Sequence, residues 1–350
     1  MKKITISILF VAFSLLATCS CSGSKEDNSA FVAEDSMPGG GKYDPTQKPE
    51  PQEPVDPIQD GNWDIYKVDE TGDLTYYCFN AFDSLSNAYQ FVNVLSVNLN
   101  STRYSVKFSY TNGSTTSAIY KANNAVGCLN ATYEKASVFI KVNGVVQQSI
   151  SSDVIPGTLV PQWKSEAAIY SDGEQDVKIQ FTAKGLDLEA TRAVYAASTK
   201  KNIFTSAPML VDNFDPIGET FINRCPGYRD GMDIYSLDYE NPILHQGQRH
   251  PRSAVALTED NHFLMIAVDG RRARVSEGMT CRELTRFLVK YFNPQYALNL
   301  DGGGSTALCV KGFGDPNTNV VNYPTDNNQY DHAGERSVPT HFYVVDNGVK

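Results

Sequence analysis

The chain has no long hydrophobic run beyond its N-terminus and no excess of basic residues. After residue 21 it contains no uncharged apolar stretch of about 18 residues, the length that a membrane-spanning helix needs, so the mature chain is not expected to span a membrane. Lys and Arg number 30 against 40 Asp and Glu, a formal net charge of −10, which excludes broad nucleic-acid binding because that requires a cationic surface. The hydrophobic fraction of 41% is enough for a sizeable core and excludes wholesale disorder.

The number and spacing of the cysteines exclude a small disulfide-stabilised protein and a small zinc-stabilised one. Only five of the seven cysteines fall after the N-terminal segment, and none is spaced as CxxC. This pattern fits neither a disulfide framework nor a zinc site. Cys128, Cys281 and Cys309 lie in apolar segments and are predicted to be small core residues.

Metal-binding patterns are also scarce. The five histidines are scattered and form no HExxH motif, so we expect no metal and no cofactor. A polar loop near the C-terminus offers oxygen donors that could hold a structural calcium ion, although without EF-hand spacing, and plain loop polarity also explains them. These donors are Asp315, Asn317, Asn319, Asp326, Asn327, Asn328 and Asp331.

The N-terminus has the pattern of a bacterial lipoprotein signal. Lys2 and Lys3 precede an apolar run over 4–17, and small residues then lead into Cys19 and Cys21. Residues 1–21 are therefore predicted to be a signal peptide with its lipobox, with Cys19 or Cys21 lipidated; an ordinary secretory peptide is the alternative. This predicts a lipid-anchored protein of the cell envelope, in the outer membrane of a Gram-negative bacterium, facing the periplasm or the outside.

Residues 22–61 have the composition of an extended tether. They contain six prolines and the run Gly39-Gly40-Gly41 but almost no aliphatic residues, so they cannot bury enough surface to offset the entropy of ordering. From residue 62 to 350 no second linker and no repeat occurs. One large domain is therefore expected over 62–350.

Strand patterns dominate that domain. We expect strands over 91–99, 104–110, 138–142, 145–150, 176–183, 262–268, 296–300 and 341–345. One helix is clearly marked, because Thr280 and Glu283 form a capping box and Asn293-Pro294 ends the apolar periodicity. Many strands and few helices in mixed order predict an α+β fold around a mixed sheet.

The segment Asn299–Thr306, Asn-Leu-Asp-Gly-Gly-Gly-Ser-Thr, is the most informative part of the chain. Gly302, Gly303 and Gly304 follow a predicted buried strand, where they allow a tight loop whose amides can face an anion. Asp301 and Ser305 would project into the same space. The segment is neither a P-loop nor a dinucleotide fingerprint, and a plain glycine turn is the alternative.

Several motifs, taken in their order along the chain, resemble those of one known family. They are Asn130-Ala131, Pro251-Arg252-Ser253-Ala254, Val268-Asp269-Gly270-Arg271, Glu277-Gly278-Met279-Thr280, Asn299–Ser305, Val321-Asn322-Tyr323-Pro324 and Gly334-Glu335-Arg336. The pattern is similar to that of the phosphodiester glycosidases, most clearly over 251–345. Residues 151–201 have no counterpart and are interpreted as a possible insertion that shapes the substrate site.

The resemblance implies cleavage of the sugar C–O bond of a sugar-1-phosphodiester on a glycan or envelope polymer. Under it, Asp301 and Glu335 are the leading catalytic carboxylates. The other roles that it implies are phosphate binding by Arg252, Arg271 and Arg336, and orientation of sugar hydroxyls or arginines by Asn130, Asp269 and Ser305. Structural alternatives remain: Asp269 could pair with Arg271 or Arg252, and Glu335 with Arg336. The implied partner is a carbohydrate or sugar phosphate, with no nucleic acid and with membrane contact through the lipid anchor alone.

Two other functions remain open at this point. A tethered, non-catalytic glycan-binding lipoprotein would suit the anchor and the abundant tyrosines. A serine hydrolase could use Ser305, because Gly303-Gly304-Ser305-Thr306-Ala307 approximates GxSxG and aspartate and histidine follow it in hydrolase order. The preceding chain, however, lacks the alternating strand–helix pattern of that fold.

Overall fold

The computed structural model describes residues 57–134, 137–151, 163–173, 175–183 and 187–348. The chain divides into two units, 1–47 and 48–350, and all described elements belong to the second. The predicted lipoprotein signal, Cys19, Cys21 and the tether up to residue 56 lie outside the described residues. Helix α1 (Pro57–Asp60) occupies the end of the range assigned to the tether. None of the described helices has the length and apolar character needed to cross a bilayer.

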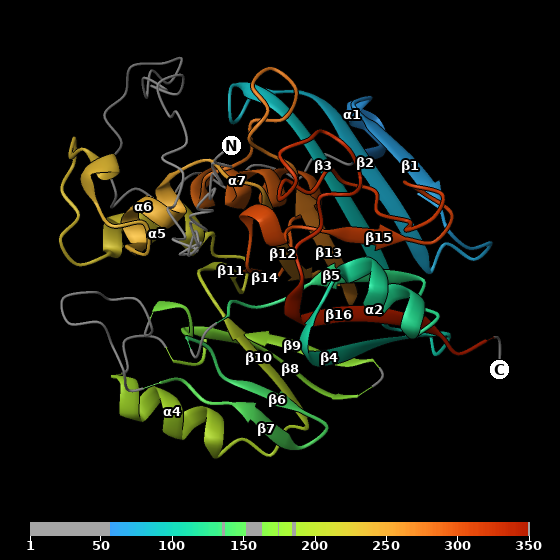
Figure 1. Ribbon diagram of the computed structural model, residues 1–350, viewed down its shortest axis with the longest axis horizontal. Coiled ribbons are helices and arrows are strands. Elements are labelled where there is room, and N and C mark those ends of the chain that lie inside the picture. The colour runs from blue at the N-terminus through green and yellow to red at the C-terminus, as the bar shows by residue number, and fades with distance from the viewer. Residues whose placement is uncertain (1–56, 135–136, 152–162, 174, 184–186, 349–350) are drawn as a thin grey trace, which may run out of the picture. The chain divides into compact units, whose positions relative to one another are not determined.

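A seven-stranded sheet carries most of the core (Figure 1). Its strands, in spatial order, are β1 (Trp63–Lys67), β2 (Leu74–Asp83), β3 (Ala88–Asn98), β13 (His262–Val268), β12 (Arg252–Leu257), β14 (Tyr296–Asn299) and β11 (Met209–Asp212). β3, β13 and β12 are central and almost wholly buried, including polar residues of β3 such as Gln90 and Asn93.

Two smaller sheets complete the described strands. The four-stranded sheet runs β15 (Leu308–Val310), β5 (Gly127–Asn130), β16 (Val338–Asp346) and β4 (Tyr104–Ser114). The five-stranded sheet runs β7 (Val145–Gln148), β6 (Ile140–Val142), β10 (Asn202–Ser206), β8 (Ala167–Gly173) and β9 (Asp176–Gln180). Residues from all three sheets share one hydrophobic cluster, with Phe108, Phe204 and Phe342 in mutual ring contact.

The expectation of a mixed sheet was wrong. Every pairing between described strands is antiparallel. The chain does cross from β13 through helix α7 (Cys281–Phe292) to β14, and such a crossover usually joins parallel neighbours. Here β12 lies between β13 and β14 and pairs antiparallel with both, so no parallel pair forms.

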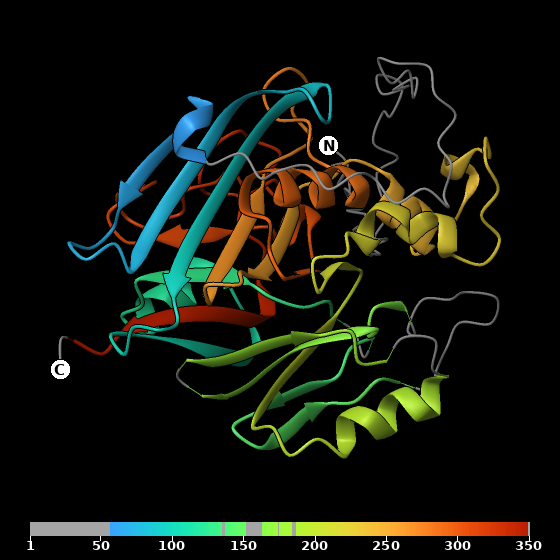
Figure 2. The same cartoon turned by 180° about the vertical axis from the view of Figure 1, so that it is seen from behind.

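Helix α7 follows the sequence prediction closely and lies against the seven-stranded sheet (Figure 2). Thr280 accepts a hydrogen bond from the Glu283 backbone N–H and Glu283 bonds back to the Thr280 N–H, which completes the capping box. The helix ends where Asn293 adopts a left-handed conformation. Its buried face packs on the aromatic rings of Trp63 and Phe79.

The other described helices are short. They are α2 (Thr116–Ala122), α4 (Leu188–Ala196), α5 (Phe221–Arg224) and α6 (Pro242–Gly247), with the 3-10 turns η1 (Ile217–Thr220), η2 (Ile234–Ser236) and η3 (Gly303–Ser305). The possible insertion at 151–201 corresponds to β8, β9 and α4, and its residues 152–162 lie outside the described part. β8 pairs with β10, which pairs in turn with β6, so the five-stranded sheet as a whole extends beyond the predicted insertion.

Candidate functional site

The loop after β14 is shaped by close backbone and side-chain contacts. Gly303 has φ +62°, in the left-handed region that favours glycine, and it lies beside the Arg271 guanidinium. A side chain at Gly304 would overlap the Asp326 carboxylate and the Arg336 guanidinium. A Cβ at Gly302 would lie 2.6 Å from the Pro251 carbonyl oxygen. The three glycines therefore allow the loop to approach two arginines and strand β12 at once.

Asn130, at the end of β5, holds this loop in place. Its Nδ2 donates to the Asp301 carbonyl oxygen at 2.8 Å, and its Oδ1 accepts from Ser253 Oγ at 2.7 Å and from the Ala307 N–H at 3.2 Å. The Asp301 N–H donates to the Ala131 carbonyl at 3.1 Å. Asn130 is fully buried, and its contacts are those of a residue that positions the backbone on both sides of the loop.

The Asp301 side chain is the carboxylate at the centre of the site. Burial raises its pKa to about 6. The nearby Ser305 hydroxyl and the positive charges of Lys164 and Arg336 lower the pKa, whereas the negative charge of Glu134 raises it. At neutral pH Asp301 is therefore mostly ionised, but it exchanges its proton close to the physiological range.

Arg336 has a fixed orientation beside this carboxylate. Its Nε donates to Asp326 Oδ2 at 2.7 Å and its Nη2 to Asp326 Oδ1 at 2.6 Å, the parallel geometry of a bidentate pair. The Arg336 side chain is still 44% exposed. The pair raises the pKa of Arg336, so the guanidinium stays charged.

Arg271 is the second cation of the site and keeps free donors. It lies just after β13 at φ +62°, an unusual backbone conformation for a residue other than glycine. Nη1 donates to Thr325 Oγ1 at 3.1 Å, and within the described part of the chain no carboxylate pairs with it. Arg271 is thus hydrogen-bonded to Thr325 and Arg336 to Asp326, and these two partners are neighbours in the chain. The remaining N–H groups of the two arginines can bind an anion such as a phosphodiester.

Asp269 is hydrogen-bonded to the chain just before Thr325 and Asp326. Its carboxylate accepts hydrogen bonds from Asn322 Nδ2 at 3.0 Å and from the Tyr323 N–H at 2.9 Å. Burial raises the pKa of Asp269 to about 7, against these two donors. The predicted alternative, an ion pair with Arg271 or Arg252, is not found among the described residues. Asp269 therefore positions the loop that holds the two arginines.

Arg252 uses its donors on groups of the protein itself. Its guanidinium makes four hydrogen bonds, all to uncharged acceptors: the carbonyls of Met279, His245 and Gln248 and the amide oxygen of Gln246. The side chain is fully buried, and burial lowers its pKa. These contacts favour a structural role that joins α6 to α7, and the predicted contact to phosphate stays a prediction.

Glu335 has a different set of partners from Asp301. Both of its carboxylate oxygens accept from Ser117 in the first turn of α2, one from the backbone N–H at 2.8 Å and one from the hydroxyl. This is a favourable place for a carboxylate, because the N–H groups of a helix N-terminus are otherwise unpaired. Burial raises the pKa of Glu335 and the bonds from Ser117 lower it. The alternative of an exposed pair with Arg336 is not found, since Arg336 binds Asp326.

Sequence reasoning did not single out Glu134 and Lys164. Glu134 closely follows the Asn130 motif, and its charge acts on both Asp301 and Arg336. Lys164 is buried against the rings of Tyr133 and Trp163, where its Nζ pairs with Glu240. Glu134 could have been noted as the next ionisable residue after that motif. Lys164 left no signal, because it reaches the site from the five-stranded sheet region.

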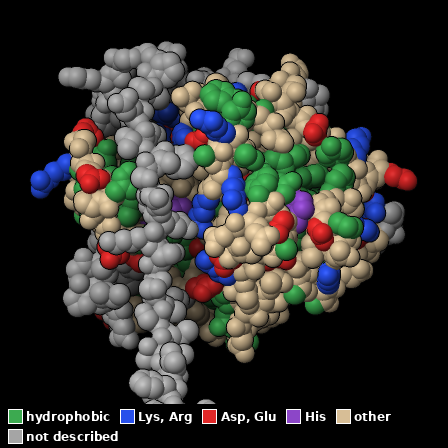
Figure 3. Space-filling view, turned by 45° about the horizontal axis from the view of Figure 1, so that its top comes forward, with side chains coloured by type: hydrophobic (Ala, Val, Ile, Leu, Met, Phe, Trp, Pro, Cys, Tyr) green, Lys and Arg blue, Asp and Glu red, His purple; other side chains and the backbone are tan. Residues whose placement is uncertain are grey.

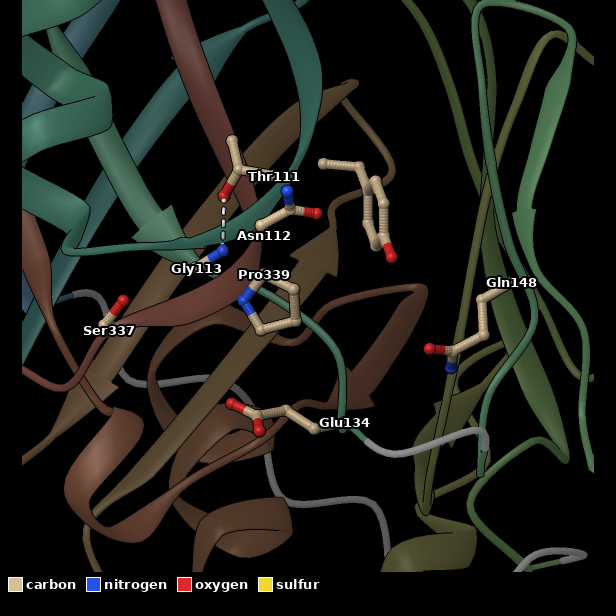
Figure 4. A pocket seen from close by; sticks show the side chains of 8 residues that line it. Thr111, Asn112, Gly113, Glu134, Gln148, Ser337 and Pro339 are labelled. Atoms are coloured by element: carbon tan, nitrogen blue, oxygen red, sulfur yellow. Dashed lines mark hydrogen bonds between the residues drawn. The ribbon is translucent and has the colours of Figure 1, made fainter.

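Glu134 also lines an open hollow of about 320 Å³ beside the site (Figure 4). The other lining residues come from the end of β4, the start of β16 and β7: Tyr110, Thr111, Asn112, Gln148 and Ser337 among them. Ser337, which lines the hollow, is the neighbour of Arg336 in the chain, whereas neither Arg336 nor Arg271 lines it. On the face turned forward in Figure 3, basic side chains gather near the centre with acidic ones beside them, despite the net negative charge of the chain.

Two other chemistries find little support at this site. The Ser305 hydroxyl is buried near the Asp301 carboxylate, and no described histidine is hydrogen-bonded to it, whereas a serine hydrolase needs such a base. The candidate calcium donors are occupied locally: Asp315 accepts from the Asn317 and Thr318 N–H groups, and Asp331 from Asn327 Nδ2. No cluster of three metal-ligating side chains occurs in the described ranges.

Comparison with known proteins defines the class. A sequence model of the phosphodiester glycosidase family matches residues 130–345, more than half of the chain, and the protein belongs to that family. The match contains Asn130, Asp301, Glu335 and the arginines described above. It therefore confirms the family resemblance noted in the sequence. No curated protein sequence matches the chain.

Solved structures are similar to this chain at low sequence identity, and the one with a TM-score above 0.5 shares its fold. The catalytic domain of zebrafish N-acetylglucosamine-1-phosphodiester alpha-N-acetylglucosaminidase, auto-inhibited by its pro-peptide, is 16% identical with a TM-score of 0.53, covering 82% of this chain and 89% of that one. A hypothetical protein from Synechocystis is 14% identical (TM-score 0.47; 79% and 62% covered), so the chain spans less than two thirds of that protein. An exported protein from Burkholderia pseudomallei is 13% identical (TM-score 0.46; 74% of both chains covered).

Proposed function

We propose that this protein is a glycosidase-type hydrolase that cleaves the sugar C–O bond of a sugar-1-phosphodiester carried on a glycan or envelope polymer. The observation that carries the proposal is the half-buried Asp301 carboxyl, whose charge acts on Arg336, next to a glycine loop that approaches both Arg271 and Arg336. Family membership supports a glycosidase-type hydrolase in general. The natural substrate and the roles of single residues belong to the proposal.

In the proposed reaction a water molecule replaces the phosphate at the anomeric carbon. The C1–O bond breaks with its electrons on the leaving oxygen, and positive charge develops at C1, which the Asp301 carboxylate stabilises. Arg271 and Arg336 bind the departing phosphomonoester and offset its added negative charge. The water loses one proton to solvent or to a carboxylate. The products are a free reducing sugar and a phosphomonoester.

A phosphate leaving group reduces the need for a strong general acid. Departure of a phosphomonoester requires far less protonation than departure of an alkoxide, so charge stabilisation by arginine can replace proton donation. Glu335, whose two oxygens both accept hydrogen bonds from Ser117, is therefore not needed as a proton donor. We propose that Glu335 acts by fixing the chain next to Arg336, and that Asp301 is the carboxylate that acts on the substrate.

The name of the zebrafish relative gives a first substrate for testing. That protein acts on an N-acetylglucosamine-1-phosphodiester, as its name states. At 16% identity the likeness supports the fold alone. An N-acetylglucosamine-1-phospho-methyl-mannoside is therefore the first member of a test panel, together with other sugar-1-phosphodiesters and UDP-sugars.

The test is turnover of this panel by the full chain, followed by phosphorus and proton NMR. Free reducing sugar plus a phosphomonoester, abolished by Asp301→Asn, would support the proposal. An alcohol plus a sugar-1-phosphate would instead identify a phosphodiesterase that cuts the P–O bond on the other side. Tight glycan binding without any product would favour the non-catalytic glycan-binding alternative.

We also propose that the protein is lipid-anchored in the outer membrane of a Gram-negative bacterium. The support is the lipobox around Cys19 and Cys21 and the proline-rich segment after it. Metabolic labelling with a fatty-acid analogue tests this. Label lost in Cys19→Ser and kept in Cys21→Ser would assign Cys19, the reverse would assign Cys21, and label absent from the unchanged chain would contradict the anchor.

A further inference from the structure

We propose that the hollow lined by Glu134 is a binding site for the leaving group, and that it takes a neutral polyhydroxyl group such as a sugar or a sugar alcohol joined through the phosphate. This inference rests on the proposed function, because it assigns the group on the far side of the phosphodiester. It concerns a place in the fold that the motif pattern did not include: the end of β4, the start of β16 and the five-stranded sheet.

The position of the hollow follows from the chain around it. Ala131 is hydrogen-bonded to Asp301, and Glu134 lies three residues further on. On the other side, Ser337 directly follows Arg336, and its hydroxyl would contact any side chain placed at Gly113. Neither Asp301 nor an arginine lines the hollow, but the charge of its lining residue Glu134 acts on both Asp301 and Arg336. A phosphodiester bound by Arg336 would have one substituent at Asp301 and the other at this opening.

The lining chemistry favours a neutral ligand with many hydroxyl groups. Glu134 is the only charged residue among the lining side chains, so a second anionic group would be repelled. Asn112 is exposed at the rim and brings both a donor and an acceptor. Gln148 faces the hollow from the opposite side, from β7, and its Nε2 donates to the Val138 carbonyl at 3.1 Å, which leaves Oε1 as an acceptor (Figure 4). Tyr110 offers a ring face on which a sugar can pack.

The size of the hollow limits what it can hold. Its volume of about 320 Å³ is near the lower end of the range for small-molecule pockets, about 300–1,000 Å³. It therefore suits one sugar-sized group. Because the hollow is open to solvent, the bound group can belong to a longer polymer that extends out of it. The site would thus recognise the sugar-sized unit next to the phosphate on a polymer.

The first experiment compares two diesters that share one donor sugar and differ only in the leaving group, methyl phosphate against methyl-mannoside phosphate. In the full chain, Asn112→Ala and Gln148→Ala should lower the ratio of kcat/KM for the mannoside diester over the methyl diester by about two- to tenfold, the effect of one lost hydrogen bond. Gln295→Ala, an exposed glutamine bound to Asn213, is the matched control and should leave the ratio unchanged. An unchanged ratio in both hollow variants would overturn the assignment.

A second experiment decides the inference even if neither diester is cleaved. Saturation-transfer NMR measures binding of methyl α-mannoside and of glucitol to the full chain. We expect transfer that weakens at least twofold in Asn112→Ala, an exposed position where the change does not threaten folding, and that persists in Gln295→Ala. No transfer, or equal transfer in all three proteins, would contradict the inference. Transfer that depends on Asn112 in a protein without turnover would retain the site and reject the proposed reaction.

Discussion

The Arg336 guanidinium and the Asp326 carboxylate form two parallel hydrogen bonds, of 2.7 and 2.6 Å, and both side chains lie against Gly304. A bidentate pair fixes the plane of the guanidinium as well as its position. The loop after Asp301 is therefore fitted to an arginine that is already oriented. We interpret Asp326 as a positioning residue that acts through Arg336.

Asp326→Asn should lower kcat/KM about tenfold or more, because the asparagine keeps the shape of the side chain but loses the charge and one of the two acceptors. Arg336→Lys should lower it at least as much, since lysine cannot form the parallel pair. The double variant should be little worse than the worse single variant, because both changes break the same interaction.

The control for this cycle is Asp172→Asn, a change in a surface aspartate that pairs with Lys200 in the five-stranded sheet. It should keep full activity. Fully additive losses in the double variant would mean that Asp326 does not act through Arg336.

Gly304→Ala should reduce kcat/KM about tenfold with a small change in melting temperature. The new methyl group would overlap the ends of the Asp326 and Arg336 side chains, which can move away only by giving up their orientation. Gly302→Ala is the informative comparison, because its Cβ would meet the backbone oxygen of Pro251, which cannot rotate aside. We expect Gly302→Ala to cost about 1–3 kcal/mol of folding stability. Equal stability losses in the two variants, measured by chemical unfolding, would contradict this distinction.

Activity should depend on the ionisation of Asp301. Burial raises its pKa to about 6, so the carboxylate form, which the proposed reaction uses, decreases as the pH falls through 6. We expect kcat/KM to drop on the acid side with an apparent pKa near 6, whereas an unperturbed aspartate would titrate near 4. The measurement is kcat/KM between pH 4.5 and 8, under conditions where circular dichroism shows the protein folded. A flat profile between pH 5 and 7 would be incompatible with this role.

Asp269 should make the protein less stable as the pH rises. Its pKa is raised to about 7 in the folded protein, so between about pH 4 and 7 the folded state keeps a proton that the unfolded state has lost. The free energy of unfolding therefore decreases across this range on account of Asp269 and levels off above pH 7. Asp269→Asn should remove that contribution and leave a less negative slope of unfolding free energy against pH.

The control for the stability prediction is Asp172→Asn. The hydrogen bond from Lys200 lowers the pKa of Asp172, so its influence on the slope has the opposite sign, and it is weak because the side chain is exposed. If Asp269→Asn and the unchanged protein show the same slope in urea unfolding between pH 4 and 7, Asp269 does not keep its proton in the folded state.

Local sequence signals predicted several of the described elements. The capping box at Thr280 and the stop at Asn293 define α7 in the structure as they do in the sequence. The Asn143-Gly144 dipeptide, which favours a tight hairpin turn, joins β6 and β7, whose strands were predicted on either side of it. The strand prediction for 262–268 coincides with β13. In each case the residues that decide the element are neighbours in the chain.

Contacts between residues far apart in the sequence could not be predicted from these local signals. The sheet was predicted as mixed from the mixed order of strands and helices, and nothing in the sequence of β12 shows that it lies between β13 and β14 and pairs antiparallel with both. Arg252 belongs to the family pattern, yet the structure uses its donors on backbone carbonyls and the Gln246 amide. Glu134 and Lys164 come near Asp301 only through tertiary packing. The strand at 138–142 begins two residues later than predicted, at Ile140, because strand ends are set by the partner strand.

The most direct test of the account is the activity of Asp301→Asn in the full chain on the sugar-1-phosphodiester that the unchanged protein cleaves. We predict a loss of kcat/KM of at least about 100-fold. The variant should remain folded, with unfolding free energy at pH 7 equal to or above that of the unchanged protein, because a neutral amide replaces a buried charge. Full activity in a folded Asp301→Asn protein would contradict the central claim that this carboxylate acts on the substrate.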